Sequence, residues 1–235
     1  MRETHRDRLH FTTAWSSVHR LKDGTNVHLR LLRPSDGERL VAGFNELSPE
    51  SRYRRFFSPM PKLPDSVLQR LLDVDDWDRL AIAADTPDAH GAHAGGVGIA
   101  RFFRLPEHPD TAEAAVAVVD HMHGRGLGKL LLSTLAAAAR ERGITTFRAE
   151  VLRTNNAMIS LLEDFDGDAE RVVDGEIAVY HLDLPPPAEE QATPLFDFLR
   201  LAARGLEILG RRLAPGEGNT LPPGGSRTPD DVDER

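Results

Sequence analysis

The spacing of apolar residues divides the chain into a mainly helical first third and a remainder in which strands and helices alternate. Apolar and polar residues alternate from Val27 to Arg33, which is typical of a half-buried strand. Ser35 and Glu38 form a capping-box pattern, which predicts a helix that runs to about Leu47. Two further helix starts are predicted at Ser48-Pro49 and at Pro64-Asp65.

From residue 80 onward, short apolar runs rich in β-branched and small residues alternate with helical patterns. Gly143 is a good stop for the longer of the two helices, and Thr154 is the expected cap of the shorter one. The predicted strands are Leu80–Ala84, Val97–Leu105, Ala112–Val119, Ile144–Leu152 and Glu176–Leu184, and the predicted helices are Lys129–Arg142 and Asn155–Asp164. This order of elements indicates an α/β protein with a mixed sheet.

The two ends of the chain differ in composition from its middle. Residues 1–20 are polar and rich in His and Arg, which predicts a loosely held arm before a domain over residues 21–184. The Pro-rich stretch 185–194 is expected to be a linker, and residues 195–213 have the apolar spacing of an amphipathic helix. The Gly/Pro/Asp-rich stretch 214–235 is expected to be a disordered tail.

Composition narrows the classes of function. The 235 residues carry a formal net charge of −8, which argues against a protein that coats nucleic acid. The absence of cysteine excludes disulfides, a cysteine nucleophile and thiolate metal sites. His121 and His123 lack an evident third ligand, so no metal is expected. Without a secretory signal or an apolar run of ~20 residues, the sequence predicts a cytoplasmic protein with no membrane partner.

A glycine-rich loop between a predicted strand and a predicted helix is the most informative stretch. It reads Gly124-Arg125-Gly126-Leu127-Gly128 and is followed by Lys129 at the start of the helix. Glycines lack Cβ atoms, so successive backbone N–H groups can converge on a phosphate. The helix N-terminus adds free donors and a positive partial charge. The loop is therefore suited to a pyrophosphate, with Arg125 and Lys129 adding charge.

Two common nucleotide-binding loops fit this stretch poorly. The nucleoside-triphosphate loop needs a glycine five positions before its Gly-Lys pair and a hydroxyl residue after it, but those positions hold His123 and Leu130. The dinucleotide fingerprint needs Gly-x-Gly-x-x-Gly, whereas the glycines here stand at 124, 126 and 128.

The acyl-CoA loop of the GNAT superfamily, Gln/Arg-x-x-Gly-x-Gly/Ala after a strand, fits better. Residues 123–128 match it, with His123 in place of the first Gln or Arg. Thr154–Met158 looks like the Asn-x-x-Met helix start of the same family. Leu21–Gly24, Arg33–Asp36 and Leu47–Phe57 look like the start of Pat-type protein lysine acetyltransferase domains. Over about residues 21–184 the chain thus resembles a GNAT acetyltransferase of the Pat type.

This resemblance implies a GNAT-like acyl-CoA N-acyltransferase fold in which acetyl-CoA, the co-substrate, lies between two splayed central strands. The backbone of Val118 and Val119 would pair with the pantetheine arm, and the Asn155 side chain would contact the same arm near the thioester. Glu113, on the same strand as Val118, would be the general base. The pyrophosphate would be held by the residues of the loop: His123, Gly124, Arg125, Gly126, Leu127, Gly128 and Lys129.

A carboxylate such as Glu113 suits transfer to an amine. With a reference pKa of ~10.4, only about one lysine amine in a thousand is neutral at neutral pH, so a base must take a proton as the amine reacts. A strand amide, for example that of Val118, would stabilise the tetrahedral oxyanion. The Pat-like blocks favour a protein lysine as the amine acceptor. The cluster Arg52, Arg54 and Arg55 either lines the acceptor side or forms a solvated helix face.

A different class of function stays open at this point. Many GNAT enzymes have a tyrosine a few residues after the Asn helix start, as general acid for the leaving thiolate, and residues 159–167 contain none. Together with His123, this motivates the alternative of a non-catalytic acyl-CoA-binding or regulatory module. The chain is expected to be a monomer or a homodimer.

Overall fold

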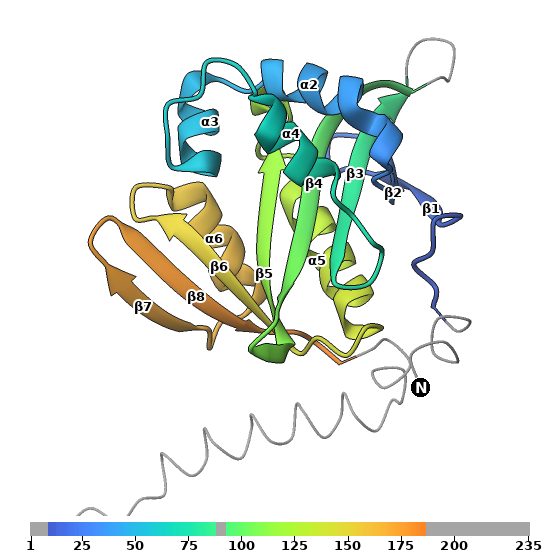
Figure 1. Cartoon of the computed structure of the whole chain (residues 1–235). Coiled ribbons are helices and arrows are strands. Elements are labelled where there is room, and N and C mark those ends of the chain that lie inside the picture. Colours follow the sequence, from blue (N-terminus) through green and yellow to red (C-terminus); the bar gives the residue numbers. More distant parts are fainter. Residues whose placement is uncertain (1–8, 88–92, 187–235) are drawn as a thin grey trace, which may run out of the picture. The chain divides into compact units, whose positions relative to one another are not determined.

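The computed structural model describes residues 9–87 and 93–186 (Figure 1). These residues belong to one compact unit, Met1–Pro187. Most of the predicted linker 185–194, the predicted helix 195–213 and the predicted tail 214–235 lie outside the described residues.

The described residues form one eight-stranded mixed sheet in the order β1-β2-β3-β4-β5-β6-β8-β7. Neighbouring strands are antiparallel except β5 and β6, which are parallel. This confirms the predicted mixed α/β fold. The strands are β1 (Ser16–Arg20), β2 (Asn26–Leu31), β3 (Arg79–Pro87), β4 (His93–Leu105), β5 (His108–Val118), β6 (Thr146–Leu152), β7 (Glu170–Asp174) and β8 (Ile177–Asp183).

Helices cover both faces of the sheet (Figure 1). On one face lie α2 (Gly37–Asn45), α3 (Pro49–Phe56) and α4 (Asp65–Leu72), and on the other lie α5 (Leu127–Arg140) and α6 (Asn156–Phe165). Short 3-10 turns precede α2 and α5, at η1 (Pro34–Asp36) and η2 (Asp120–Met122). The α5 helix packs closely on β4: a Cβ at Gly98 would come within 2.9 Å of Leu131 Cδ1. Small residues at this contact let the helix approach the strands that carry the site.

Residues 9–20 are held by the domain, which corrects this part of the predicted loose arm over residues 1–20. Ser16–Arg20 forms the edge strand β1, and Phe11 is buried. The fully buried Arg142 guanidinium donates to the Phe11 carbonyl at 2.7 Å, and the Glu141 carboxylate accepts from the His10 and Phe11 amides. These contacts join residues more than 120 positions apart in the sequence, so local sequence patterns cannot predict them.

Two of the three predicted helix caps change. Ser48 caps α3 as predicted, since its hydroxyl accepts from the Ser51 amide at 3.1 Å. The cap predicted at Ser35 is wrong, because α2 begins only at Gly37, after a 3-10 turn. The cap predicted at Thr154 is also wrong, because Asn155 itself caps α6.

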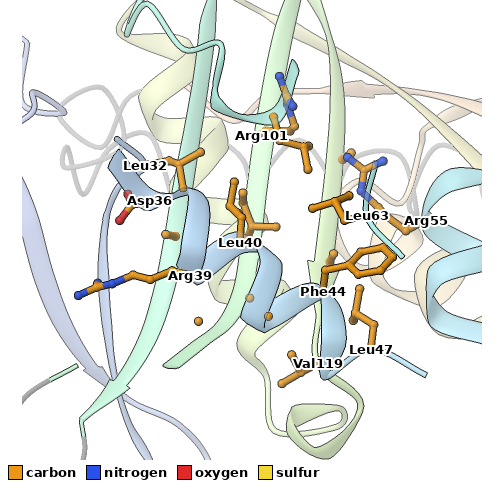
Figure 2. A pocket seen from close by; sticks show the side chains of 18 of the residues that line it. Leu32, Asp36, Arg39, Leu40, Phe44, Leu47, Arg55, Leu63, Arg101 and Val119 are labelled. Carbon is orange, nitrogen blue, oxygen red and sulfur yellow. The ribbon is translucent and has the colours of Figure 1, made fainter. Parts of the chain in front are cut away.

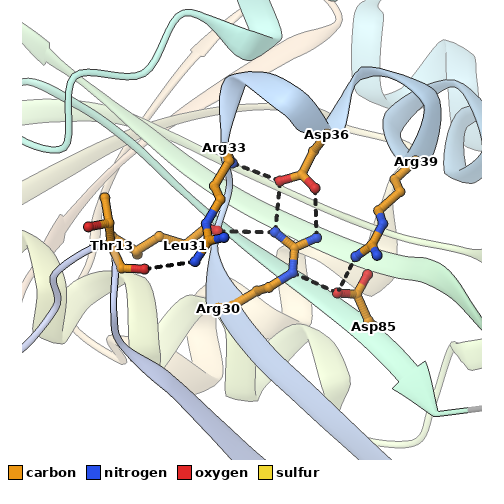
Figure 3. A network of polar contacts seen from close by, with 7 residues as sticks. All are labelled: Thr13, Arg30, Leu31, Arg33, Asp36, Arg39 and Asp85. Carbon is orange, nitrogen blue, oxygen red and sulfur yellow. Dashed lines mark hydrogen bonds and ion pairs between the residues drawn. The ribbon is translucent and has the colours of Figure 1, made fainter. Parts of the chain in front are cut away.

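An ion network anchors the start of α2 to the sheet (Figure 3). The Arg30 guanidinium of β2 donates to Asp36 at 2.7 Å and to Asp85 of β3 at 2.9 Å. Asp36 also accepts from the Arg33 amide at 2.7 Å. Partial burial raises the pKa of Asp36, but these hydrogen bonds outweigh it and hold that pKa below its ordinary value. The network therefore fixes α2, and the helices after it, against the strands.

Candidate active site

A cleft opens where the two parallel central strands separate. β5 and β6 pair at three positions only, the last of them Glu113 with Arg148. Beyond this pair both strands continue without pairing to each other, β5 to Val118 and β6 to Leu152. A cleft of about 700 Å³ lies along the separated strands and reaches the glycine loop and the start of α6. The free backbone groups of β5 there can pair with a ligand as a neighbouring strand would.

The direction of the β5 backbone separates the two valines that sequence reasoning grouped together. The Val119 amide donates to the Val97 carbonyl of β4 at 3.0 Å, so it is not free for a ligand, and Val119 does not line the cleft. Successive residues in a strand direct their N–H groups to opposite sides, so the Val118 N–H points toward the cleft. The Val118 carbonyl is bound by the His123 ring, with Nε2 at 2.9 Å.

The glycine loop has the backbone that a phosphate site needs. Gly124 and Gly126 adopt φ of 74° and 92°, in the left-handed region that favours glycine. Gly126 is the N-cap of α5, and no side chain caps the helix there. The amides of the first turn of α5 therefore face the cleft as free donors. Every residue from His123 to Lys129 lines the cleft.

The positively charged side chains around the loop are not limited to the expected pair, Arg125 and Lys129. Arg125 donates to the Asp23 carboxylate at 2.6 Å, so its charge is shared with a neighbour. Hydrogen bonds from the Thr25 amide and hydroxyl, and to a lesser extent this arginine, keep the pKa of Asp23 below its ordinary value. Lys22 also lines the cleft, and its side chain passes 3.8 Å from the position of a Cβ on Gly126. Sequence reasoning missed Lys22 as a site residue, because its position depends on the β1–β2 hairpin.

Asn155 combines two roles. Its Oδ1 accepts from the Met158 amide at 3.3 Å and caps α6. The side chain is almost completely buried and lines the cleft. Because Oδ1 is occupied, the amide NH₂ group is the part that can donate to a ligand.

Glu113 lies at the point where the cleft closes, in the middle of β5, because the strand begins earlier than predicted, at His108. Its side chain is 54% exposed and lies 3.9 Å from Arg148. A second carboxylate, Glu150, lines the cleft two residues beyond Arg148 on β6 and accepts from that arginine at 2.5 Å. The sequence alone did not point to Glu150, because a half-buried polar residue in a strand looks the same whether or not it lines a cleft.

Neither tyrosine of the chain lines the cleft. Tyr180 is buried in β8, and its hydroxyl has no hydrogen-bond partner within the described residues. Tyr53 points to solvent from α3. A tyrosine that protonates a leaving group is therefore not part of this cleft as the described residues form it.

Asp120 connects the start of α3 to the strand end before the glycine loop. Its carboxylate accepts from the Ser48 amide at 2.9 Å, the Ser48 hydroxyl at 2.7 Å and the Ser51 hydroxyl at 2.9 Å. Partial burial raises the pKa of Asp120, but these hydrogen bonds hold it below its ordinary value. This contact sets how α3 lies over the cleft.

Residues 9–87 and 93–186 contain neither a metal-binding cluster nor a membrane-spanning helix. No group of three His, Asp or Glu side chains is arranged there to hold a metal ion. No helix in this part of the chain is both long and apolar enough to cross a membrane.

Comparison with known proteins gives a consistent result. Residues 38–166 match the model of the acetyltransferase (GNAT) family. The acetyltransferase Pat of Mycolicibacterium smegmatis is 32% identical over 185 residues, which cover 78% of this chain and 54% of that protein. The chain thus spans about half the length of this relative.

Solved structures that resemble this chain have the same fold. The crystal structure of the GNAT domain of S. lividans PAT matches with a TM-score of 0.66 and 33% identity, covering 74% of this chain and 99% of that one. The structure of yncA from Salmonella typhimurium, solved with its cofactor acetyl-CoA, shares the fold at 18% identity with a TM-score of 0.52, covering 72% of this chain and 97% of that one.

Proposed function

Because the chain belongs to the GNAT acetyltransferase family, we propose that it is an N-acetyltransferase that moves the acetyl group of acetyl-CoA directly to an amine, with a protein lysine as acceptor. The observation that carries the proposal is the cleft between β5 and β6, with the uncapped N-terminus of α5 at one end and a carboxylate at the other. Five residues separate Val118 from Glu113, a distance of about 17 Å along a strand. An extended pantetheine arm along β5 would thus place the thioester near Glu113.

The residues of the cleft would divide the binding of acetyl-CoA among them. The amides from Gly124 to Lys129 would hold the pyrophosphate, with Lys22 and Lys129 supplying charge. The Val118 N–H would pair with the pantetheine arm, and the Asn155 amide would donate near the thioester. Arg125 would contribute less than the sequence suggests, because Asp23 already shares its charge.

Glu113 would act as the base of the transfer. The amine nitrogen forms a bond to the acetyl carbon, the carbon–sulfur bond breaks, and the proton that the amine loses passes to Glu113, directly or through a water. An amide of β5 would stabilise the oxyanion. The sulfur would leave as a thiolate, which a thiol pKa of ~8.5 makes acceptable without a tyrosine.

The comparisons support the general activity, and the Pat-like sequence blocks support the acceptor. The relative from M. smegmatis carries the name acetyltransferase, and yncA was solved with acetyl-CoA. The lysine acceptor rests on the resemblance of Leu47–Phe57 to Pat-type domains.

One observation favours a second candidate, a non-catalytic acyl-CoA-binding module. The His123 ring occupies the Val118 carbonyl, which an incoming pantetheine arm needs as an acceptor. A protein that binds acetyl-CoA with this ring in place would hold its arm differently from an active enzyme.

A transfer assay separates the two candidates. The chain has no cysteine, so CoA release can be followed with a thiol reagent without any signal from the protein. We expect release to depend on a lysine peptide, with an acetylated peptide appearing in equal amount by mass spectrometry. Binding of acetyl-CoA without turnover on any amine would refute the enzyme and support the module, and no binding would refute both.

A further inference from the structure

A small pocket adjoins the acetyl-transfer cleft on the sheet face covered by α2, α3 and α4 (Figure 2). It has a volume of about 80 Å³, and its walls are mainly apolar. Figure 2 shows the guanidinium groups of Arg55 and Arg101 at the same end of it. The pocket and the cleft share four lining residues: Leu47, Arg55, Ala115 and Ala117. A molecule bound in the cleft at Glu113 can therefore extend toward these two arginines.

The three arginines of α3 have different surroundings. Arg52 donates to the carbonyls of Pro61 and Asn45 and lies over the Phe44 ring at 4.4 Å, so it holds the helix in place. Arg54 pairs with Glu50 one turn away, at 2.6 Å. Arg55 has no hydrogen bond or ion pair within residues 9–87 and 93–186; its contact there is with the Phe56 ring, at 5.2 Å. A partly covered guanidinium without a partner is costly, unless a ligand supplies one.

The second arginine strengthens the case for an anion. Arg101 of β4 donates to the Arg70 carbonyl at 3.2 Å, a neutral acceptor, and makes no ion pair within the described residues. Burial and then the neighbouring charge of Arg101 lower the pKa of Arg55, Glu113 acts in the opposite sense, and the result is a pKa of about 10. Burial also lowers the pKa of Arg101, and Asp73 and Glu113 oppose the shift. Glu113 thus faces two cations, while it also lies near Arg148.

We propose that Arg55 and Arg101 form a carboxylate subsite for the acceptor, which binds an acidic side chain flanking the lysine that becomes acetylated. This inference rests on the proposed function. A guanidinium pair matches a carboxylate in shape and charge. The acceptor carboxylate supplies the two arginines with a hydrogen-bonded counter-charge.

The first test compares pairs of acceptor peptides that differ only in a carboxylate or a neutral amide on one side chain. Each pair of peptides has one lysine and either Glu or Gln at a single position, from three residues before the lysine to three after it. We expect one position at which Glu raises kcat/KM at least about ten-fold over Gln, the usual worth of a charge-assisted hydrogen bond. Arg55→Gln should bring this ratio to about one, and Arg55→Glu should favour a Lys-flanked peptide instead. Arg153→Gln, which removes an exposed arginine outside the cleft and the pocket, should keep the wild-type ratio.

The second test does not depend on activity. N-acetylglutamate amide has the carboxylate but no amine, and N-acetylglutamine amide is its neutral counterpart. We expect millimolar N-acetylglutamate amide to raise the melting temperature of the wild type but not of Arg55→Gln, and the neutral probe to raise neither. Without any probe, Arg55→Gln should melt no lower than the wild type, whereas Arg52→Gln should melt lower because it loses its carbonyl contacts.

The outcomes separate the subsite from the proposed function. Transfer to peptides with no Arg55-dependent preference at any position, together with no effect of the acidic probe, would overturn the subsite alone. Binding of the acidic probe without transfer to any peptide would support the subsite and refute the lysine acceptor. An Arg55-dependent preference for free amino acids over peptides would keep the subsite and move the carboxylate to a small-molecule acceptor. A large loss of stability in Arg55→Gln would show a structural role and contradict the inference.

Discussion

Glu113→Gln is the sharpest test of the proposed chemistry. The side chain is 54% exposed, and its nearest cation is Arg148 at 3.9 Å, an ion pair worth at most about 1 kcal/mol. The variant should therefore fold and melt like the wild type. It should also bind acetyl-CoA with unchanged affinity, because the proposed cofactor contacts lie on other residues.

The expected loss of rate follows from the acceptor. At pH 7.4 a lysine amine with a pKa of ~10.4 is neutral in about one molecule in a thousand, so a base that removes the proton in place contributes up to about 10³-fold. Glu150 of β6 also lines the cleft and can take over part of this role through a water. We therefore expect kcat to fall about 10²–10³-fold at pH 7.4. The loss should shrink about ten-fold for each pH unit, to about ten-fold or less near pH 9.4.

The assay is a pH–rate profile with saturating acetyl-CoA and a lysine peptide, corrected for hydrolysis without the peptide. Glu176→Gln, in the exposed β7–β8 turn, is the matched control and should follow the wild type. A ratio near one at every pH would remove Glu113 from the mechanism. A larger loss in Glu150→Gln than in Glu113→Gln would assign the base to the other strand.

Three further predictions concern the loop and the fold. Gly126→Asp places a side chain where φ is 92°, which costs about 1–2 kcal/mol, and adds a negative charge beside the proposed phosphate site. Acetyl-CoA should therefore no longer raise the melting temperature of this variant. If acetyl-CoA still raises it, the loop is excluded as the cofactor site. Asp36→Asn removes the 2.7 Å ion pair with Arg30 and should lower the free energy of unfolding in urea by about 3 kcal/mol, and a loss under about 1 kcal/mol would contradict this role. Because the folded pKa of Asp120 lies below its ordinary 3.8, its stabilising effect is complete above that pH and is lost as pH falls through the folded pKa. The wild type should thus melt above Asp120→Asn at pH 7, and this difference in melting temperature should shrink as the pH is lowered below 3.8. A difference that stays constant into that acid range would contradict the role of the Asp120 carboxylate.

Short-range patterns predicted most of the elements. The start of α3 at Ser48-Pro49 and the glycine loop before α5 depend on residues within one turn of each other, so they can be recognised locally. The strands that contribute to the core carry alternating or continuous apolar residues for the same reason. The two strands that sequence reasoning missed, β1 and β7, are edges of the sheet. All five residues of β7 are exposed, so it has no buried face to produce a pattern.

The sequence by itself determined the chemistry of the loop, because three glycines and a helix start fix which backbone groups are free. Tertiary structure decided which groups meet that loop and the cleft beside it. The pairing of β5 with β4 determined that Val118, and not Val119, faces the cleft. Folding over long distances brought Lys22 to Gly126. Among the residues that the structure describes, it also left Arg55 without a hydrogen bond or an ion pair, although Arg52 and Arg54 look the same in the sequence. Contacts of this kind depend on the packing of whole elements, which local spacing does not encode.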